Sequence, residues 1–344
     1  MEEDTMTQLK VGILGATGMV GKELIKVLFD REFPIESLKL YASKRSVGKK
    51  IETPLGKIAV ENVDTADYSQ LDIAFFAISG EWSKENAQKA TKADCIVIDN
   101  SSAFRYDEDV PLVIPEINPQ AIGDSKLIAN PNCTTAIAAI PLYQIYKNYG
   151  LKRVIISTYQ SVSGAGNRGM DELEEETRRE LSGEKASNKL FPYPIPFNVI
   201  PQIDTFQENG YTREEMKILW EIRKIFGDEN IPISCTCVRI PTMRAHSESI
   251  VVETDKPIYP EKVRKIFGNT PGIVVRDDTK NNVYPMPLTA SEKYDVEVGR
   301  IRQSLIFKDH GLEFFLSGDQ LLKGAALNAV QIGELVVKKK GLKI

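Results

Sequence analysis

Cys133 is the residue of this 344-residue chain whose surroundings best suit covalent chemistry. It follows the turn-forming residues Ala-Asn-Pro-Asn and precedes a run, Thr-Thr-Ala-Ile-Ala-Ala-Ile, that predicts the first turns of a helix. A helix N-terminus stabilises negative charge, and the thiolate is the attacking form of cysteine. Most cysteines are instead buried and inert, and Cys95, Cys235 and Cys237 stand in apolar runs that fit this structural role. The sequence therefore predicts Cys133 as a nucleophile.

The chain has two histidines, and His246 is the one that stands among other candidate binding residues. It lies in the run CVRIPTMRAHSES, seven residues after Arg239. An imidazole beside a thiol can activate the nucleophile and move protons, although an isolated histidine is more often a structural hydrogen-bonding group. Arg239 and Arg244 are candidates for binding an anionic substrate, although arginines at strand ends are commonly solvated. His310, in the turn-like sequence KDHG, is predicted to be a surface residue.

Two further segments carry polar side chains that could contact a substrate. Glu214 and Lys217 are three residues apart in a charged helical run, which places both on one helix face. Such a pair is usually a surface salt bridge that contributes little, and the spacing alone favours that reading. Gln160 follows a predicted strand in the sequence QSVSGAG, which offers a carboxamide and several backbone N–H donors.

A glycine-rich segment near the N-terminus, Gly15-Ala-Thr-Gly18-Met-Val-Gly21, predicts a phosphate-binding loop. Glycines allow a tight turn and let backbone N–H groups approach a pyrophosphate at the positive end of a helix. A tight turn kept only for packing is the competing interpretation. Because the segment lies between a predicted strand and a predicted helix, in the first βαβ unit, dinucleotide binding is favoured.

The end of the second predicted strand indicates which dinucleotide is bound. NAD-binding proteins tend to place a carboxylate there, against the ribose diol. This chain has Ser43-Lys44-Arg45-Ser46 at that point, with no carboxylate. A guanidinium and hydroxyl groups suit a 2′-phosphate, so NADP is favoured, although a basic loop is often only solvated.

The strands and helices that position these residues fall into two halves of the chain, and the two halves have different sequence patterns. The first half alternates strand-like and helical runs, which implies βαβ units and a parallel sheet; strands are predicted at 10–14, 38–42, 72–78 and 95–99, and helices at 19–29 and 83–91. After about residue 133 the pattern indicates a mixed or antiparallel sheet, with strands at 153–159, 234–240, 247–253 and 312–317, helices at 171–181 and 211–226, and a proline-rich loop at 191–202. We expect a first domain of residues 1–132, onto which a C-terminal helix within 323–344 packs, and a second domain of residues 133–322.

The composition excludes several classes of protein. A net charge of −4 and 42% hydrophobic residues are ordinary for a globular protein and give no basic surface for nucleic acid. No apolar run approaches the roughly 18 residues that a membrane helix needs, and the acidic N-terminus does not resemble a secretory signal. Four cysteines do not form a disulfide framework, which favours a cytoplasmic location, and two histidines make a histidine-rich metal site improbable.

Together these motifs resemble the aspartate-β-semialdehyde dehydrogenase family from about residue 11 to 337. The resemblance is carried by the segments GATGMVG, NSSAFR, NPNCTT, STYQSVSGAG, EEMK and CVRIPTMRAHSES. It implies a Rossmann-type NADP-binding domain and an α+β catalytic and dimerisation domain, as in glyceraldehyde-3-phosphate dehydrogenase-like folds. It further implies a homodimer or homotetramer and the reversible reaction of L-aspartyl-4-phosphate and NADPH to L-aspartate 4-semialdehyde, phosphate and NADP⁺.

The resemblance also implies roles for individual residues. Cys133 would form a thioester, His246 would act as acid and base, and Gln160 would orient the acyl group. Substrate binding falls to five residues: Arg239 for the α-carboxylate, Glu214 for the ammonium, Lys217 and Arg105 for the phosphate, and Asn132 nearby. Cofactor binding falls to Gly15, Thr17, Gly18, Met19, Val20, Ser43, Arg45, Ser46, Ser79, Gly80, Ser163, Gly164 and Asn328. No metal is expected.

Three alternatives remain open on the sequence alone. A related acyl reductase, acting on N-acetylglutamyl phosphate or malonyl-CoA, would share the glycine loop and the cysteine. A non-enzymatic NADP-binding sensor would explain the loop but would leave Cys133, His246 and Arg239 without roles. An aldehyde dehydrogenase with a water-attacked thioester is generally a longer chain with a different loop.

Overall fold

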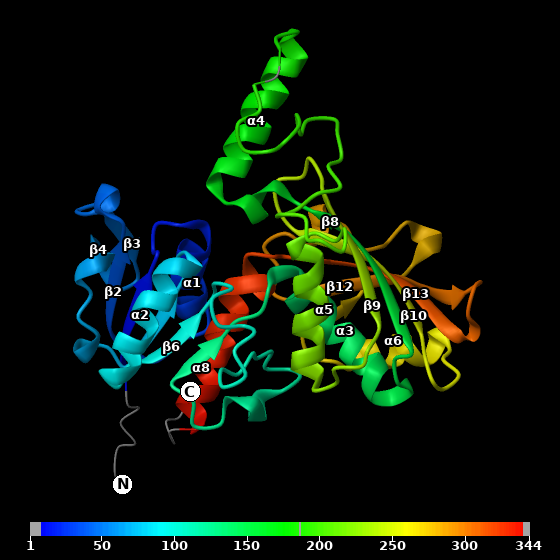
Figure 1. Cartoon of the computed structure of the whole chain (residues 1–344), viewed down its shortest axis with the longest axis horizontal. Coiled ribbons are helices and arrows are strands. Elements are labelled where there is room, and N and C mark those ends of the chain that lie inside the picture. Colours follow the sequence, from blue (N-terminus) through cyan, green and yellow to red (C-terminus); the bar gives the residue numbers. More distant parts are fainter. Residues whose placement is uncertain (1–7, 186, 340–344) are drawn as a thin grey trace. The chain divides into compact units, whose positions relative to one another are not determined.

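The computed structural model describes residues 8–185 and 187–339, and the chain divides into two compact units. Unit 1 comprises Met1–Asn132 with Ala325–Ile344, and unit 2 comprises Cys133–Gly324. The outermost residues that the sequence assigns to the first domain, 1–7 and 340–344, lie outside the described residues. Each unit is built around one β-sheet (Figure 1).

The sheet of unit 1 has seven strands in the order β3-β4-β2-β1-β5-β6-β7. Neighbouring strands are parallel except in the β3–β4 hairpin. The strands are β1 (Leu9–Leu14), β2 (Ile35–Ala42), β3 (Lys50–Thr53), β4 (Gly56–Asn62), β5 (Ile73–Phe76), β6 (Ile96–Asp99) and β7 (Leu127–Ala129). The apolar runs of β1, β5 and β6 are buried, as expected of parallel strands covered on both faces.

Three helices pack in unit 1: α1 (Met19–Asp30), α2 (Gly80–Lys92) and α8 (Leu327–Lys339). Helix α1 turns one apolar stripe inward, with Leu24, Val27 and Leu28 fully buried. Helix α8 comes from the far end of the chain and is joined to α1 by an ion pair in which Arg31 Nε lies 2.5 Å from Glu334 Oε1. Unit 1 is therefore completed by α8, the last described helix.

The sheet of unit 2 has six strands in the order β11-β12-β13-β10-β8-β9. The β8–β9 and β11–β12 pairs are parallel and the others antiparallel. The strands are β8 (Arg153–Gln160), β9 (Ile233–Arg239), β10 (His246–Glu253), β11 (Ile273–Val275), β12 (Val296–Ser304) and β13 (Lys308–Gly318); the helices are α3 (Cys133–Tyr149), α4 (Asn167–Ser182), α5 (Arg213–Phe226), α6 (Pro260–Gly268) and α7 (Pro287–Ala290).

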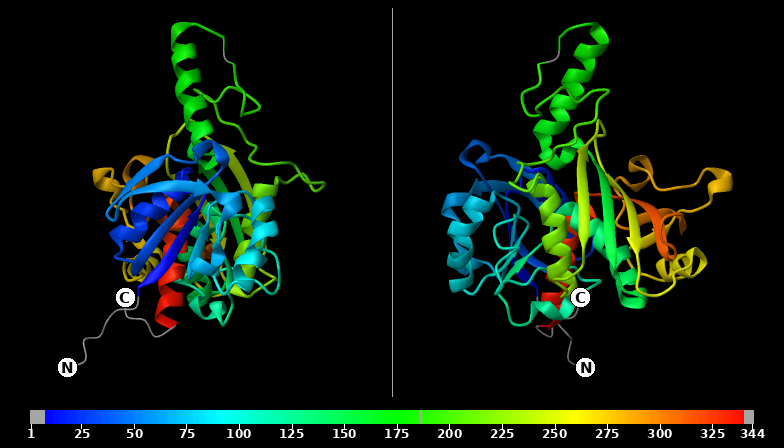
Figure 2. Two further views of the ribbon diagram at one scale, coloured as in Figure 1. Left: turned by 90° about the vertical axis from the view of Figure 1, so that its left-hand side faces the viewer. Right: turned by 45° about the vertical axis from the view of Figure 1, so that its right-hand side comes forward.

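The two faces of this second sheet differ in exposure. Along β8, Val154 and Ile156 are buried, while Ile155 and Tyr159 on the other face are exposed. Helices α3, α5 and α6 pack in the same unit as the sheet, and α4 projects away from it (Figure 2). One sheet face is thus part of the core, and the other keeps apolar side chains accessible.

The predicted α/β fold with a parallel first sheet and a mixed second sheet is confirmed. Strands β3, β4, β7, β11 and β12 and helix α6 were not predicted, because they are short or interrupted by charged residues. The turn expected at KDHG is wrong: His310 lies in β13, is half-buried, and its Nδ1 lies 3.0 Å from the Thr254 carbonyl oxygen. The polar sequence KDHG favours a turn, but beyond the last β10–β13 pair, Glu253 with Gly311, the Thr254 N–H still donates to the His310 carbonyl oxygen at 2.8 Å.

Candidate active site

The glycine loop of unit 1 joins β1 to α1 in a conformation that two of its glycines require. Gly15 has φ of 97°, and a Cβ there would lie 2.1 Å from the Ala77 carbonyl oxygen. A Cβ on Gly21 would lie 2.2 Å from the Gly15 carbonyl oxygen. Gly18 is the N-cap of α1 and has no side chain to cap the helix, and Thr17, Met19 and Val20 are partly exposed. The loop therefore has the features of a site for a phosphate at a helix N-terminus.

The residues predicted to select NADP lie beside this loop. Ser43 directly follows β2, and Lys44–Ser46 form a single 3-10 turn. The hydroxyl of Ser46 lies 3.4 Å from that of Thr17 in the glycine loop, and Arg45 is exposed. Hydroxyl and guanidinium donors are thus available within unit 1 at the carboxyl end of the parallel sheet.

Five other predicted site residues belong to unit 1, and most of them make local contacts. Ser79 caps α2 by accepting from the Trp82 N–H at 3.4 Å, and Gly80 begins that helix. Arg105 is buried and donates to the Asn100 carbonyl oxygen at 2.8 Å. Asn328 is fully buried and donates to the Val113 carbonyl and to Asn130 Oδ1, so its amide group serves packing within unit 1. Asn132, also buried, directly precedes the cysteine.

Cys133 is the first residue of α3 in unit 2 and is partly exposed, whereas the other three cysteines are buried. Its sulfur lies 4.0 Å from the Thr134 hydroxyl. A Cβ on Gly324 would lie 2.8 Å from the Cys133 Cβ, so the backbone of this glycine packs directly against the cysteine. The structure thus holds a single accessible thiol among the described cysteines at the N-terminus of a helix, where a thiolate is stabilised.

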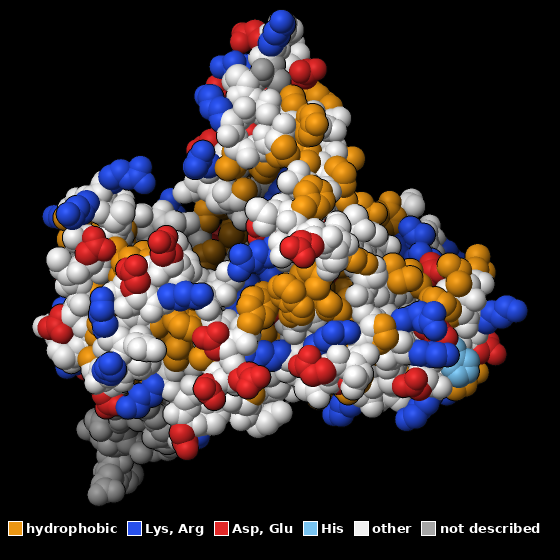
Figure 3. Space-filling view, viewed as in Figure 1, with side chains coloured by type: hydrophobic (Ala, Val, Ile, Leu, Met, Phe, Trp, Pro, Cys, Tyr) orange, Lys and Arg blue, Asp and Glu red, His pale blue; other side chains and the backbone are white. Residues whose placement is uncertain are grey.

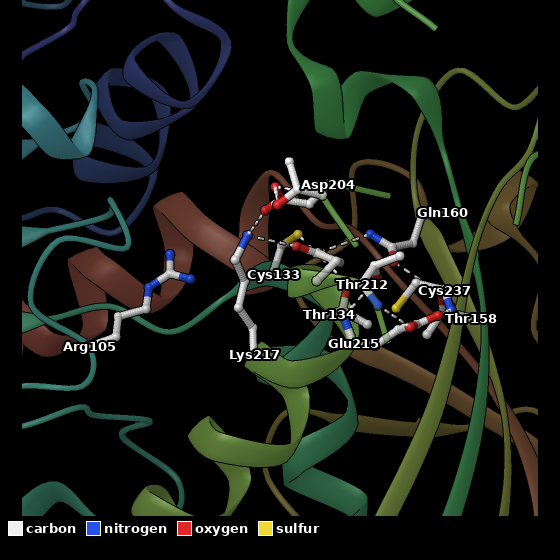
Figure 4. Close-up of polar contacts among 12 residues, drawn as sticks. Arg105, Cys133, Thr134, Thr158, Gln160, Asp204, Thr212, Glu215, Lys217 and Cys237 are labelled. Carbon is white, nitrogen blue, oxygen red and sulfur yellow. Dashed lines mark hydrogen bonds and ion pairs between the residues drawn. The ribbon is translucent and has the colours of Figure 1, made fainter. Parts of the chain in front are cut away.

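A chain of charged and polar groups leads from β8 to α5. Gln160 is buried, accepts from the Thr158 hydroxyl at 3.0 Å and donates to Glu214 Oε1 at 3.3 Å. Lys217 Nζ lies 3.0 Å from Glu214 Oε2 and 2.8 Å from Asp204 Oδ2. Burial lowers the pKa of Lys217, but Glu214 and Asp204 outweigh it and leave that pKa raised. Figure 4 shows Gln160, Lys217 and Asp204 gathered around Cys133.

The Glu214–Lys217 pair differs from the surface salt bridge that its spacing favours. Both side chains are largely buried, at 7% and 13% exposed, and they share Asp204, which the sequence did not indicate. The next residue, Glu215, has a purely structural arrangement. It forms a capping box with Thr212 and accepts from the Cys237 N–H at 2.9 Å, which fixes the start of α5 against β9.

Arg239, at the end of β9, is a buried cation held in one position. Its Nη1 donates to the Ser161 carbonyl oxygen at 2.6 Å, and its guanidinium lies 6.0 Å from the centre of the Phe191 ring. Burial lowers the Arg239 pKa, and Glu214 and Cys133 act to raise it. Arginine nevertheless stays charged in proteins, so Arg239 remains a fixed positive group near the Cys133 thiol.

His246 is fully buried at the start of β10. Its Nδ1 lies 3.1 Å from both the N–H and the hydroxyl of Ser161. Burial, followed by the charge of Arg239, lowers the His246 pKa to about 3 against a weaker opposing effect of Glu214. A Cβ on Gly164 would lie 2.9 Å from Arg239 Nη1 and 3.3 Å from His246 Nε2, so this position needs glycine to leave room for both groups.

Unit 2 therefore brings together eight of the predicted site residues: Cys133, Gln160, Ser163, Gly164, Glu214, Lys217, Arg239 and His246. Arg244, the other candidate for an anionic substrate, is paired with Asp319 at 2.6 Å instead. Sequence reasoning missed Asp204, Ser161 and Gln320. None of the three stands in a recognisable spacing pattern, because their partners are distant in sequence.

The charged side chains gathered near Cys133 suit a small zwitterionic substrate. Arg239 and Lys217 can bind anionic groups, while Glu214 can bind a cation. Within residues 8–185 and 187–339, no group of three or more His, Cys, Asp or Glu side chains could hold a metal ion. In the same part of the chain, no helix is both long and apolar enough to cross a membrane.

Both units of the chain match models of known protein families. Residues 10–125 match the family model described as semialdehyde dehydrogenase, NAD binding domain, and residues 141–323 match semialdehyde dehydrogenase, dimerisation domain. A curated aspartate-semialdehyde dehydrogenase of Aquifex aeolicus is 48% identical over 96% of this chain and 98% of its own length. Aspartate-semialdehyde dehydrogenase 2 of Vibrio cholerae is 45% identical over the same shares.

Solved structures extend the similarity to the whole fold. The Vibrio cholerae aspartate semialdehyde dehydrogenase II complexed with ASA has a TM-score of 0.94, 44% identity, and coverage of 96% of this chain and 99% of that one. A probable aspartate-semialdehyde dehydrogenase from Pseudomonas aeruginosa has a TM-score of 0.92 and 29% identity, with 97% and 100% covered. On its two domain matches and its full-length relatives, this chain belongs to the aspartate-semialdehyde dehydrogenase family, whose members are phosphorylating oxidoreductases.

Proposed function

We propose that the protein catalyses the reversible, NADPH-dependent conversion of L-aspartyl-4-phosphate to L-aspartate 4-semialdehyde and phosphate, through a thioester on Cys133. The observation that carries this proposal is the partly exposed Cys133 at the start of α3, in a pocket that also holds the buried Arg239 and the Glu214–Lys217 pair. The full-length similarity to aspartate-semialdehyde dehydrogenases supports it. The product would serve the synthesis of lysine, threonine, methionine and diaminopimelate.

The charged groups of the substrate match those of the pocket. The α-carboxylate pairs with Arg239, because a buried guanidinium offers two parallel donors to a carboxylate. The ammonium binds Glu214, which then exchanges part of its present contact with Lys217 for the substrate. Lys217 and Arg105 receive the phosphate, with Asn132 beside the nucleophile. A substrate that lacks the ammonium would leave Glu214 and Lys217 paired with each other.

The chemistry begins when the Cys133 thiolate attacks the acyl phosphate and phosphate leaves, which forms a thioester. Gln160 holds the acyl group, since its carboxamide is fixed between Thr158 and Glu214. Bound NADPH supplies the hydride that reduces the acyl carbon. His246 exchanges a proton with the oxygen of the resulting hemithioacetal, which then collapses to aldehyde and free thiolate.

The cofactor-binding residues fit a dinucleotide phosphate. Gly15, Thr17, Gly18, Met19 and Val20 provide the loop and the uncapped N-terminus of α1 for the pyrophosphate. The hydroxyls of Ser43 and Ser46 and the Arg45 guanidinium suit the 2′-phosphate, and no carboxylate follows β2 to bind a ribose diol. The nicotinamide end falls to Ser79, Gly80, Ser163, Gly164 and Asn328, with Asn328 acting through packing because it is buried.

A homodimer formed through unit 2 is part of the proposal. The matched dimerisation domain spans most of this unit, and Ile155 and Tyr159 expose an apolar face of its sheet. The segment around α4 adds exposed apolar side chains, including Leu181 and Phe197, and Figure 3 shows apolar atoms along this projection. The four free cysteines fit a cytoplasmic enzyme.

The direct test follows NADP⁺ reduction by absorbance with aspartate semialdehyde, in the presence and absence of phosphate. Cys133→Ala should abolish the phosphate-dependent reduction, whereas the matched control Cys95→Ala, at a buried position of unit 1, should retain it. N-acetylglutamate semialdehyde and malonate semialdehyde serve as competing substrates. Folded, NADP-binding protein that reduces no NADP⁺ with aspartate semialdehyde would reject the substrate assignment, and preference for a competitor would identify the alternative reductase.

A further inference from the structure

A chain of hydrogen bonds lies behind His246. The Ala245 N–H donates to Gln320 Oε1 at 2.8 Å, which fixes the orientation of that carboxamide. Gln320 Nε2 must therefore donate, and it does so to the Ser163 hydroxyl at 2.5 Å. The Ser163 and Ser161 hydroxyls lie 3.0 Å apart, and the Ser161 hydroxyl lies 3.1 Å from His246 Nδ1. Since Ser163 accepts from the amide, its own proton is free to point toward Ser161.

The same ring nitrogen also faces a donor that cannot be reversed. The Ser161 backbone N–H lies 3.1 Å from His246 Nδ1, and an amide N–H only donates. A proton on Nδ1 would oppose this N–H directly. Nδ1 therefore accepts, and a neutral imidazole with an accepting Nδ1 carries its proton on Nε2.

The opposite ring nitrogen is the one left for a ligand. Among the described residues, no group bonds to His246 Nε2, although the atom is buried. The Gly164 position leaves open the space next to it, because a Cβ there would lie 3.3 Å from Nε2. A buried donor without a protein partner points to an acceptor supplied by a bound molecule.

We propose that Gln320, Ser163 and Ser161 are positioning residues that place the ring proton of His246 on Nε2, so that a neutral imidazole meets the substrate oxygen as a hydrogen-bond donor. The role toward the oxygen rests on the function proposed above. In this role, His246 stabilises the hemithioacetal oxyanion as negative charge develops on the oxygen. The Nε2–H group donates a hydrogen bond to this oxygen as the charge develops, and the proton that His246 exchanges with the hemithioacetal is the proton on Nε2.

The charged groups around His246 favour this neutral form. Burial of the ring, followed by the charge of Arg239 of β9, lowers the His246 pKa, and Glu214 of α5 and the Ala245 backbone oppose them only partly. Arg244, two residues before His246, is neutralised by Asp319. Glu248, two residues further along β10, has a pKa raised well above its usual range by burial and is itself uncharged.

The structure offers an internal control with the opposite tautomer. His310 Nδ1 lies 3.0 Å from the Thr254 carbonyl oxygen, which only accepts, so His310 carries a proton on Nδ1. Protein labelled with ¹⁵N-histidine contains only these two imidazoles. The spectrum should show His246 with an unprotonated Nδ1 and a protonated Nε2 from pH 5 to 8. His310→Gln identifies the second set of signals. A protonated Nδ1 on His246 would overturn the proposal whatever substrate the enzyme uses.

The role of the hydrogen bonds from Gln320 to His246 in catalysis is tested separately with Gln320→Glu. A carboxylate only accepts hydrogen bonds, so the Ser163 hydroxyl would have to donate to it. The Ser163 proton would then no longer point toward Ser161, whose hydroxyl faces His246 Nδ1. We expect a roughly tenfold to hundredfold loss of kcat, a KM for aspartate semialdehyde that changes little, and a new ionisation in the pH profile. Gln303→Met, which removes three amide bonds to carbonyl oxygens of unit 2, is the structural control and should leave kcat and the profile unchanged.

Equal losses of kcat in the Gln320→Glu and Gln303→Met variants would mean that Gln320 only supports the fold. A selective rise in the KM for NADP⁺, with kcat and the histidine spectrum unchanged, would show that Gln320 serves the cofactor instead. Either result overturns the assignment of Gln320. If the labelled spectrum is as expected but the unmodified protein does not reduce NADP⁺ with aspartate semialdehyde, the tautomer of His246 is supported and the substrate assignment is rejected.

Discussion

The glycine loop of unit 1 and the His246 pocket of unit 2 position their groups by opposite means. The loop is a continuous stretch of seven residues whose shape depends on missing side chains, since a Cβ at Gly15 or Gly21 would overlap backbone atoms. The pocket instead joins Ser161, His246 and Gln320 through side-chain hydrogen bonds across 75 to 157 positions of sequence. Local steric requirements define the first site, and satisfaction of buried polar groups defines the second.

After the loss of the nucleophile itself, Arg239→Lys should have the largest effect on the His246 site. A lysine cannot bond the Ser161 carbonyl oxygen and a substrate carboxylate in the planar arrangement of a guanidinium. We expect a loss in kcat/KM of about 100-fold, which corresponds to roughly 3 kcal/mol, within the usual range for a buried charge contact. Steady-state kinetics with aspartate semialdehyde measure it, and an unchanged KM for NADP⁺ would separate the effect from the cofactor.

Gly21→Ala is the matching test of the loop. The added methyl group would meet the Gly15 carbonyl oxygen at 2.2 Å and the Ala16 Cα at 2.7 Å, which forces the backbone apart. Overpacking of this kind costs about 1–3 kcal/mol, and we expect at least a tenfold rise in the KM for NADP⁺ together with a lower Tm. Gly268→Ala, in a helix with open space around it, is the control. Equal behaviour of the two variants would contradict the steric account.

Arg45→Ala should have a smaller and more selective effect, because the side chain is exposed beside the loop. Loss of one contact to a 2′-phosphate should raise the KM for NADP⁺ about tenfold, which is roughly 1.4 kcal/mol, and leave the KM for NAD⁺ unchanged. The exposed Lys49 provides the control variant Lys49→Ala. A parallel loss with both dinucleotides would show that Arg45 does not recognise the phosphate.

Glu248→Gln should have the smallest effect, on stability and only at higher pH. Burial raises the Glu248 pKa well above 4.5, and neither carboxyl oxygen has a partner in the described part of the chain. Above pH 4.5 the unfolded chain therefore binds fewer protons than the folded one, so this group makes the folded state less stable as pH rises. The substitution should raise Tm by about 2–4 °C at pH 8 and not at pH 4.5. Equal shifts at both values would contradict a buried neutral carboxyl.

This contrast also explains what could be predicted from the sequence. The glycine loop and the start of α3 at Cys133 were readable, because their determinants lie within a few residues of each other. The capping box of Thr212 and Glu215 left a similar local signal. Asp204, Ser161 and Gln320 left none, since each gains its role only when the chain folds. His310 was misplaced because its hydrogen bonds to Thr254, which is distant in sequence, extend β13 over residues that favour a turn locally.

The discontinuity of unit 1 has a consequence for how the protein is made. Helix α8 covers the first sheet, with Gly333 against Phe33 and Phe75, yet it is encoded after the whole of unit 2. At a synthesis rate of about 5–20 residues per second, the strands of unit 1 wait roughly 10–40 s on the ribosome before this helix emerges. Unit 2 is contiguous and can finish first. The unit that begins synthesis is therefore the last to be completed, and the apolar surface that α8 covers stays exposed during that interval.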